Sequence, residues 1–241
     1  MKQKPALFFA TVLFATLAVS LFSCKAEDPL LEPLVELENA DIPGGEAGDQ
    51  RIAELEKEIE RYSEMVEEQV HANGQLMVYY RMLGIRYLER KLYGPAMEAL
   101  QSAMEISPAN PILHAYYAAA AAQSAKADYS GARRNQLLAT AEAAYMRALE
   151  IDPNYADALY GLSVLLVFEL GRPADALGYL NRLVTVRTRD MNAYFLRARV
   201  YASLGRVQDA AADYDTIIEE SRDPLQQQKA QELHSQLLGG E

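Results

Sequence analysis

A motif that returns after 34 residues constrains the fold of this 241-residue chain more than any other feature. The letters "LGR" stand at residues 170–172 and again at 204–206, and in both copies an alanine follows five positions after the glycine. Around each copy, apolar residues recur at intervals of three and four, the spacing of one face of an α-helix. A sequence that repeats at this period predicts a stack of similar helical units.

The segment 77–110 carries the same pattern in "MVYYRMLGIRYLERKLYGPAMEALQSAMEISPAN". It resembles the tetratricopeptide repeat (TPR), a 34-residue helix–turn–helix with large–Leu-Gly–Tyr, then Ala–large–Ala, then Pro. The resemblance implies an all-α fold, a TPR-type helical-hairpin solenoid of about four repeats over 77–222. Their expected bounds are 77–110, 111–155, 156–190 and 191–222. The positions that the resemblance assigns to packing are Tyr80, Leu83, Gly84, Tyr87, Ala96, Leu100, Ala103, Pro108, Ala141, Tyr145, Ala148, Pro153, Leu159, Leu162, Ala176, Tyr194, Ala198, Tyr201, Ala210 and Tyr214.

The second unit is longer than the others. Pro108 and Pro153, which close successive units, are 45 residues apart, eleven more than the period. Eleven residues make almost three α-helical turns, so an insertion of that size lengthens a helix without rotating its buried face. We expect "GARRNQLL" to extend the second helix of this unit at its N-terminal end, with "KADYS" as the turn. The residues that keep the phase are Leu137, Ala141, Ala144, Ala148 and Ile151.

Two further helices are expected beside the repeats. Residues 223–241 would form a helix with apolar residues on one side and glutamines on the other, as expected of a helix that caps a repeat stack. Residues 51–74 carry apolar residues spaced three and four over 52–66. That helix could pack on the first repeat, or it could be a coiled-coil seam that makes a homo-oligomer.

The N-terminus has the character of an export signal. Lys2 and Lys4 precede an apolar run that reaches Phe22. Leu21-Phe22-Ser23-Cys24 resembles the lipobox of bacterial lipoproteins, which implies a signal peptide over 1–23 and lipid on Cys24, the single cysteine. An uncleaved membrane anchor and plain secretion are the alternatives. Residues 24–50 combine carboxylates with proline and glycine, and we expect either an extended tether there or a disordered stretch with no spacing role.

The chain is acidic, with a formal net charge of −11. Loss of Lys2 and Lys4 with the leader would leave −13. Such a protein is repelled by phosphate backbones, so nucleic acid is not an expected partner. Anionic lipid repels it as well, so membrane attachment is expected to come from lipid chains.

We find no sequence pattern for catalysis, and we expect a protein that is not an enzyme and has no cofactor or metal. The three histidines, His71, His114 and His234, fall in different predicted helices. No HExxH, phosphate-binding loop, nucleophile elbow or EF-hand loop occurs.

The resemblance instead implies a concave groove, formed by the first helices of the repeats, that binds a protein segment. Aromatic and arginine side chains are the types that anchor interfaces. The alternative for each aromatic is packing between repeats. The expected groove residues are Arg81, Ile85, Tyr116, Ala119, Tyr160, Val164, Phe168, Phe195 and Arg199.

These features predict a lipid-anchored adaptor in the bacterial envelope, with the outer membrane preferred, that binds a protein partner through its groove. Arginines concentrated in residues 172–206 suggest an extended or acidic partner segment. Two alternatives remain at this stage. The protein could serve a solute-uptake system beside a substrate-binding protein, or it could be a self-associating architectural lipoprotein.

Overall fold

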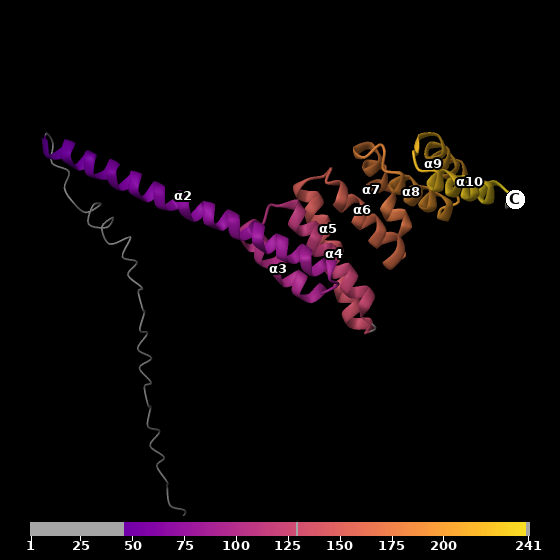
Figure 1. Ribbon diagram of the computed structural model, residues 1–241, viewed down its shortest axis with the longest axis horizontal. Helices are drawn as coiled ribbons and strands as arrows, with labels where there is room; N and C mark the ends of the chain where they lie inside the picture. Colours follow the sequence, from indigo (N-terminus) through magenta and orange to yellow (C-terminus); the bar gives the residue numbers. More distant parts are fainter. Residues whose placement is uncertain (1–45, 129, 240–241) are drawn as a thin grey trace, which may run out of the picture. The chain divides into compact units, whose positions relative to one another are not determined.

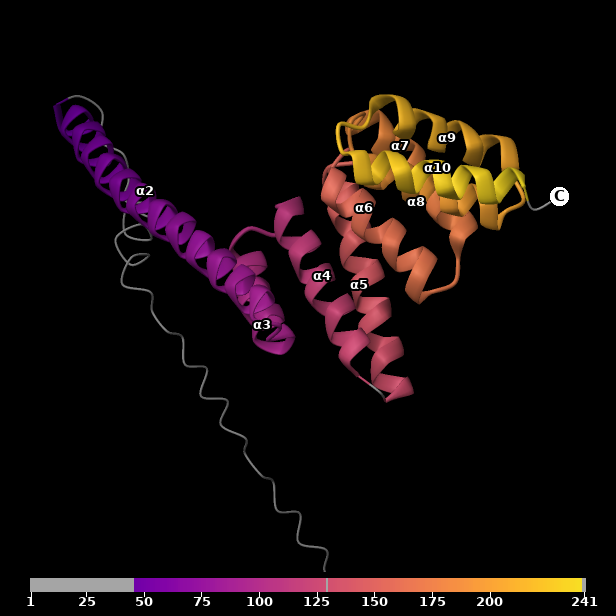
Figure 2. The ribbon, with the colours of Figure 1, turned by 45° about the vertical axis from the view of Figure 1, so that its right-hand side comes forward.

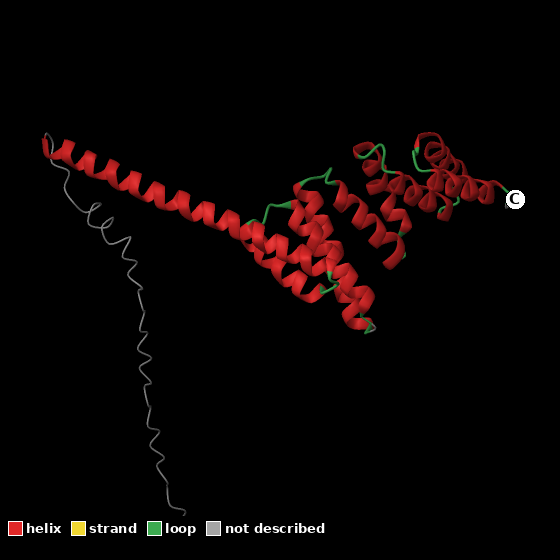
Figure 3. Cartoon of the chain, in the orientation of Figure 1, coloured by secondary structure: helices red, strands yellow, loops and turns green. Residues whose placement is uncertain are grey.

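The computed structural model describes residues 46–128 and 130–239, and over these ranges the chain forms helices and short turns, with no strand (Figure 3). By its internal contacts the chain divides into two units, Met1–Arg61 and Tyr62–Glu241. Helix α2 (Glu46–Glu89) passes through the boundary, and all later helices belong to the second unit. The predicted leader, Cys24 and the tether up to residue 45 lie outside the described residues.

Helices of the second unit follow one another as hairpins (Figures 1 and 2). The C-terminal part of α2 packs with α3 (Tyr93–Ile106). The next hairpins are α4 (Pro111–Ala127) with α5 (Gly131–Ile151), α6 (Ala156–Val164) and the π-helix η1 (Leu165–Glu169) with α7 (Pro173–Val186), and α8 (Met191–Ser203) with α9 (Val207–Glu220). Helix α10 (Pro224–Leu238) packs against α9.

Local sequence signals set the helix ends. The side chains of Asn110, Asp190 and Asp223 accept hydrogen bonds from the backbone N–H two residues later, which satisfies a donor at the start of a helix. Gly171 and Gly205, the glycines of the two "LGR" copies, have φ of 63° and 72°. Glycine reaches this left-handed region without steric cost, so these residues reverse the chain between the helices of a hairpin.

Small residues bring the helices close together. Ala118 and Ala121 of α4 are fully buried, as are Ala141 and Ala148 of α5. A methyl group at Gly84 would lie 2.6 Å from Cγ of Leu100, so α2 and α3 meet at a distance that only glycine permits.

Most residues expected to pack are buried or half-buried, and three are exposed. Pro108 and Pro153 lie in the turns between hairpins. Leu83 differs from the expectation because its side chain is 43% exposed. Helix α3 covers the side of α2 that carries Gly84, and no described helix precedes α2 to cover the neighbouring side.

The boundary expected between a helix over 51–74 and a first repeat from 77 is absent, since α2 continues through Gly74. Glycine inside a helix costs only about 1 kcal/mol relative to alanine. The surrounding leucine, methionine, glutamine and glutamate residues are good helix formers, and they outweigh that cost. The helix also begins at Glu46, so the predicted tether does not reach residue 50.

The eleven-residue insertion lengthens both helices of its hairpin rather than the second alone. Helix α5 has 21 residues and α4 has 17, whereas α3, α7 and α9 have 14 each. Lys126 and Ala127, expected in the turn, belong to α4. The buried leucine of the extension is Leu138 rather than Leu137, which is half-buried.

Candidate functional site

A cavity of about 270 Å³ opens between the second and third hairpins. Three of the expected groove residues, Ala119, Tyr160 and Val164, line it, together with residues that the sequence did not single out for binding. We call this space the α4/α6 cavity. Its lining is Ala119, Ala122, Gln123 and Lys126 from α4, Tyr145 from α5, Asp157, Tyr160, Gly161 and Val164 from α6, and Leu165 and Glu169 from η1.

Tyr145 reaches the cavity because Gly161 has no side chain. A Cβ at position 161 would lie 2.5 Å from the phenolic oxygen of Tyr145. Burial raises the pKa of Tyr145 to about 12, and the charge of Asp157 adds to the effect. The phenol therefore keeps its proton at neutral pH and can donate a hydrogen bond to a bound group.

Glu169 is the least exposed of the charged residues in the cavity lining. Its carboxylate lies 2.7 Å from Nη2 of Arg134 and 3.3 Å from Nζ of Lys126, and its side chain is only 12% exposed. Both cations lie in the parts of α4 and α5 that the insertion lengthened. The insertion thus provides the charges that neutralise Glu169.

Glu169 ends a π-helical turn with one surplus residue. Fifteen positions separate Ala156 from Gly171, whereas fourteen separate Met191 from Gly205 at the same place in the next repeat. The surplus is absorbed in η1, where the backbone N–H of Leu170 donates to the carbonyl of Leu165, five residues back, at 3.0 Å. Such turns occur often at functional sites. Counting the two spacings would have revealed this feature in the sequence.

A second pair of expected groove residues lies on η1 and α8. The guanidinium carbon of Arg199 is 4.9 Å from the ring centroid of Phe168, a cation–π contact. Phe168 is 50% exposed and Arg199 is also exposed. Among the described residues Arg199 makes no ion pair, so its charge is available to a partner.

The remaining expected groove residues do not join these two features. The ring of Phe195 lies 6.3 Å from that of Tyr214 and packs on the C-terminal core. Tyr116 packs against the cluster that contains Leu100. Arg81 and Ile85 are half-buried on α2.

The arginine-rich stretch is largely neutralised within the repeats. Arg172 contacts Glu142 and Asp175, Arg187 contacts Asp157 and Asp190, and Arg206 contacts Asp209. A broad positive surface, which the sequence suggested, is therefore not formed. The positive charge left over at the candidate site is that of Arg199.

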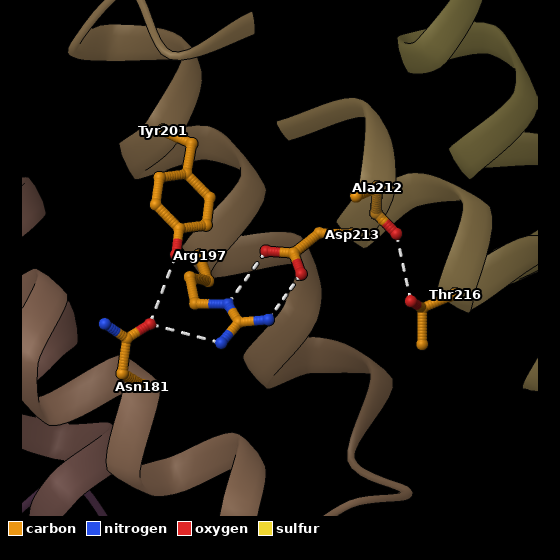
Figure 4. Close-up of polar contacts among 6 residues, drawn as sticks. All are labelled: Asn181, Arg197, Tyr201, Ala212, Asp213 and Thr216. Carbon is orange, nitrogen blue, oxygen red and sulfur yellow. Dashed lines mark hydrogen bonds and ion pairs between the residues drawn. The ribbon is translucent and has the colours of Figure 1, made fainter. Parts of the chain in front are cut away.

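Arg197, by contrast, forms hydrogen bonds that join neighbouring helices (Figure 4). Its guanidinium donates to both carboxylate oxygens of Asp213, at 2.6 and 2.9 Å, and to Oδ1 of Asn181 at 3.1 Å. Tyr201 also donates to Asn181, at 3.2 Å. Burial raises the pKa of Asp213, and the hydrogen bonds from Arg197 oppose that rise. This network ties α7, α8 and α9 together.

The histidines do not form a site. The ring of His114 hydrogen-bonds the carbonyl of Pro108 at 2.8 Å, and His234 lies 3.4 Å from Asp215. Over residues 46–128 and 130–239, no three His, Cys, Asp or Glu side chains come together as metal ligands. None of the helices in these ranges combines the length and apolar character needed to span a membrane.

Comparison with known proteins agrees with the repeat pattern. Family models described as tetratricopeptide repeat match residues 144–178 and 164–224. A TPR repeat-containing protein from Borreliella burgdorferi is 26% identical over 229 residues, which cover 94% of this chain and 99% of the relative.

Two solved structures show the same fold. A thermophilic TPR protein from Thermus thermophilus matches with a TM-score of 0.56 at 19% identity, over 78% of this chain and 96% of that one. YrrB, a TPR protein with an unusual peptide-binding site, matches with a TM-score of 0.53 at 16% identity, over 72% and 83% of the two chains. The expected all-α solenoid is confirmed, and residues 144–224 match models of the tetratricopeptide repeat.

Proposed function

We propose that this protein is a lipid-anchored adaptor of the bacterial envelope, which holds a protein partner at the α4/α6 cavity and the adjoining helices. Proteins of this fold typically mediate protein–protein interaction. The observation that carries the proposal is the cavity itself. It has apolar walls, a buried phenol that can donate a hydrogen bond, and a neutralised carboxylate in its lining.

These features favour a partner segment with an apolar side chain and a nearby carboxylate. The walls contributed by Ala119, Ala122 and Val164 offer apolar surface to a side chain. Arg199, exposed over the ring of Phe168, offers a cation that lacks a carboxylate partner within the described residues. An extended acidic segment with one apolar anchor would satisfy both.

The anchoring half of the proposal rests on the sequence at Cys24. The apolar run before it, the lipobox-like Leu21-Phe22-Ser23 and the carboxylate-rich residues after it support lipidation followed by a spacer. Several acyl chains would hold the protein stably, since a single chain gives only marginal binding. Lys25 in place of an inner-membrane retention aspartate favours the outer membrane.

The test is in-cell crosslinking, affinity capture of the tagged full-length protein and mass spectrometry, for the parent and two variants. Phe168→Ala/Arg199→Ala removes the exposed pair. Leu225→Ala/Arg222→Ala removes an apolar residue and a cation that are also exposed, on another surface.

A stoichiometric partner should be captured by the parent and by the Leu225/Arg222 control. Its affinity for the Phe168/Arg199 variant should fall at least about 30-fold, the loss typical of interface anchors. Equal capture by all three proteins would reject this surface as the binding site. Separately, Cys24→Ala should lose incorporation of a palmitate analogue, and label that survives would reject the anchor.

A further inference from the structure

We infer that two copies of this chain associate through residues 51–73 of α2 as a parallel, two-stranded coiled coil. The observation is a row of exposed apolar side chains along one face of the helix. Ile52, Leu55, Ile59, Val66 and Val70 are between 39% and 65% exposed. This association goes beyond the proposed groove, and it depends neither on the groove nor on the anchor.

The face follows a heptad rather than a general amphipathic pattern. Heptad positions a and d are the two that form the seam of a coiled coil. With Ile52 at a, the a positions are Ile52, Ile59, Val66 and Asn73, and the d positions are Leu55, Tyr62 and Gln69. The outward positions b, c and f over the same stretch are Ala53, Glu54, Lys57, Glu60, Arg61, Glu64, Glu67, Glu68 and His71.

The seam ends where the repeats begin. From Met77 onward the same side of α2 packs on its own hairpin, because Met77 and Tyr80 contact the cluster of Leu100, Ala103 and Leu113. The stretch available to a second copy is thus about three heptads, roughly 33 Å of helix. The helix is continuous over this stretch.

The residue types along the seam favour a second copy of this chain as the partner of this helix. β-Branched residues at a favour two strands where leucine stands at d, as Leu55 does, and a single asparagine at a fixes register. The other two d positions are Tyr62 and Gln69. In a parallel, in-register pair Asn73 faces Asn73 of the other copy, and the two amides can hydrogen-bond. An antiparallel pair would instead set Asn73, an a position, against a d position such as Leu55 and leave its amide without a partner in the seam.

The residues that flank the seam favour the same arrangement. In a parallel pair each g position faces the e position five residues later in the other copy. Arg51 of one copy then faces Glu56 of the other, and the two have opposite charges. Met65 of one copy faces Val70 of the other, and both are apolar. Met65 and Val70 are 49% and 65% exposed outside the a and d positions, and the parallel pairing accounts for both.

The consequence is a molecule with two partner-binding surfaces. Joining two binding modules makes the second binding event intramolecular and raises avidity when the partner also has two sites.

The test is disulfide crosslinking of the full-length chain in cells, with Cys24→Ser so that the introduced thiol is the only one. Ile52→Cys, Ile59→Cys and Val66→Cys place it at a positions. Ala53→Cys, Glu60→Cys and Glu67→Cys, each one residue later, are matched controls at position b. The a-position variants should yield mostly disulfide-linked dimer under mild oxidation, at least about tenfold more than their b-position partners.

Three outcomes would overturn the inference. The first is equal crosslinking at a and b positions. The second is crosslinking of Leu55→Cys only when it is mixed with Asn73→Cys, which would indicate an antiparallel pair. The third is a native mass spectrum of the detergent-released chain at one or three times the monomer mass. Phe168→Ala/Arg199→Ala should crosslink as the parent does, so a failed groove and a failed coiled coil give different results.

Discussion

At the scale of single residues, the Arg197–Asp213 pair makes the strongest stability prediction. Asp213 is 5% exposed at its side chain and Arg197 is 17% exposed. Arg197→Ala would leave a buried carboxylate without its cation, which typically costs about 3–5 kcal/mol of unfolding free energy. Arg206→Ala removes an exposed pair with Asp209 and should cost far less, because solvent screens that pair. Urea denaturation of the two variants measures the contrast.

The pH dependence of that loss follows from the pKa of Asp213. Burial raises this pKa above its ordinary value, and removal of Arg197 takes away the hydrogen bonds that oppose the rise. A carboxyl whose pKa is higher in the folded than in the unfolded state stabilises the fold when protonated, and this contribution is lost as pH rises through the folded pKa. The deficit of Arg197→Ala should therefore shrink between pH 7 and pH 5. A deficit that is constant over this range would show that Asp213 stays ionised without Arg197.

Residue identity predicted some of these details and not others. The family resemblance marked Gly84 as a packing position, and a Cβ there would lie only 2.6 Å from Cγ of Leu100. It also marked Leu83 as a packing position, but Leu83 is exposed because no helix among the described residues covers that side of α2. Each of Arg172 and Arg187 also has one partner 30 residues earlier in the chain, and only the three-dimensional stacking brings these pairs together.

At the scale of elements, the π-helix predicts which deletion the fold tolerates. Deleting Phe168 from η1 restores the fourteen-residue spacing of α8, and it should change the unfolding free energy by less than about 1 kcal/mol, because the surplus residue is exposed. Deleting Arg199 from α8 is the matched control. That helix has no surplus, so the deletion turns buried Val200 or Leu196 by about 100° and should cost roughly 3 kcal/mol or more.

Thermal unfolding followed by circular dichroism distinguishes the two deletions. Equal losses of stability would mean that the π-helix is integral to the packing of its hairpin.

The lengths of α4 and α5 were only partly predictable from the sequence. The phase of the eleven-residue insertion was predictable from its apolar spacing, but its division between α4 and α5 depends on where the short turn at residues 128–130 fits.

At the scale of the whole molecule, the core of the second unit is a series of local clusters rather than one centre. Leu100 belongs to a cluster at the first hairpin, Ile217 to a cluster at the last, and the largest cluster lies between them. The repeat period made this organisation predictable. The α4/α6 cavity was not, because it combines an insertion in one repeat with a surplus residue in the next.

This serial arrangement predicts which helices lose stability when a core residue of one repeat is replaced. Ile217→Ala and Leu100→Ala each remove a fully buried side chain, at a cost of about 2–5 kcal/mol. Because each repeat contacts mainly its neighbours, stability is close to a sum of local terms. Native-state hydrogen exchange should therefore show Ile217→Ala lowering protection most in α8, α9 and α10, and Leu100→Ala lowering it most in α3 and α4. A uniform loss across all helices in both variants would instead show that the repeats unfold as one cooperative unit, in which a change at either end reaches the α4/α6 cavity equally.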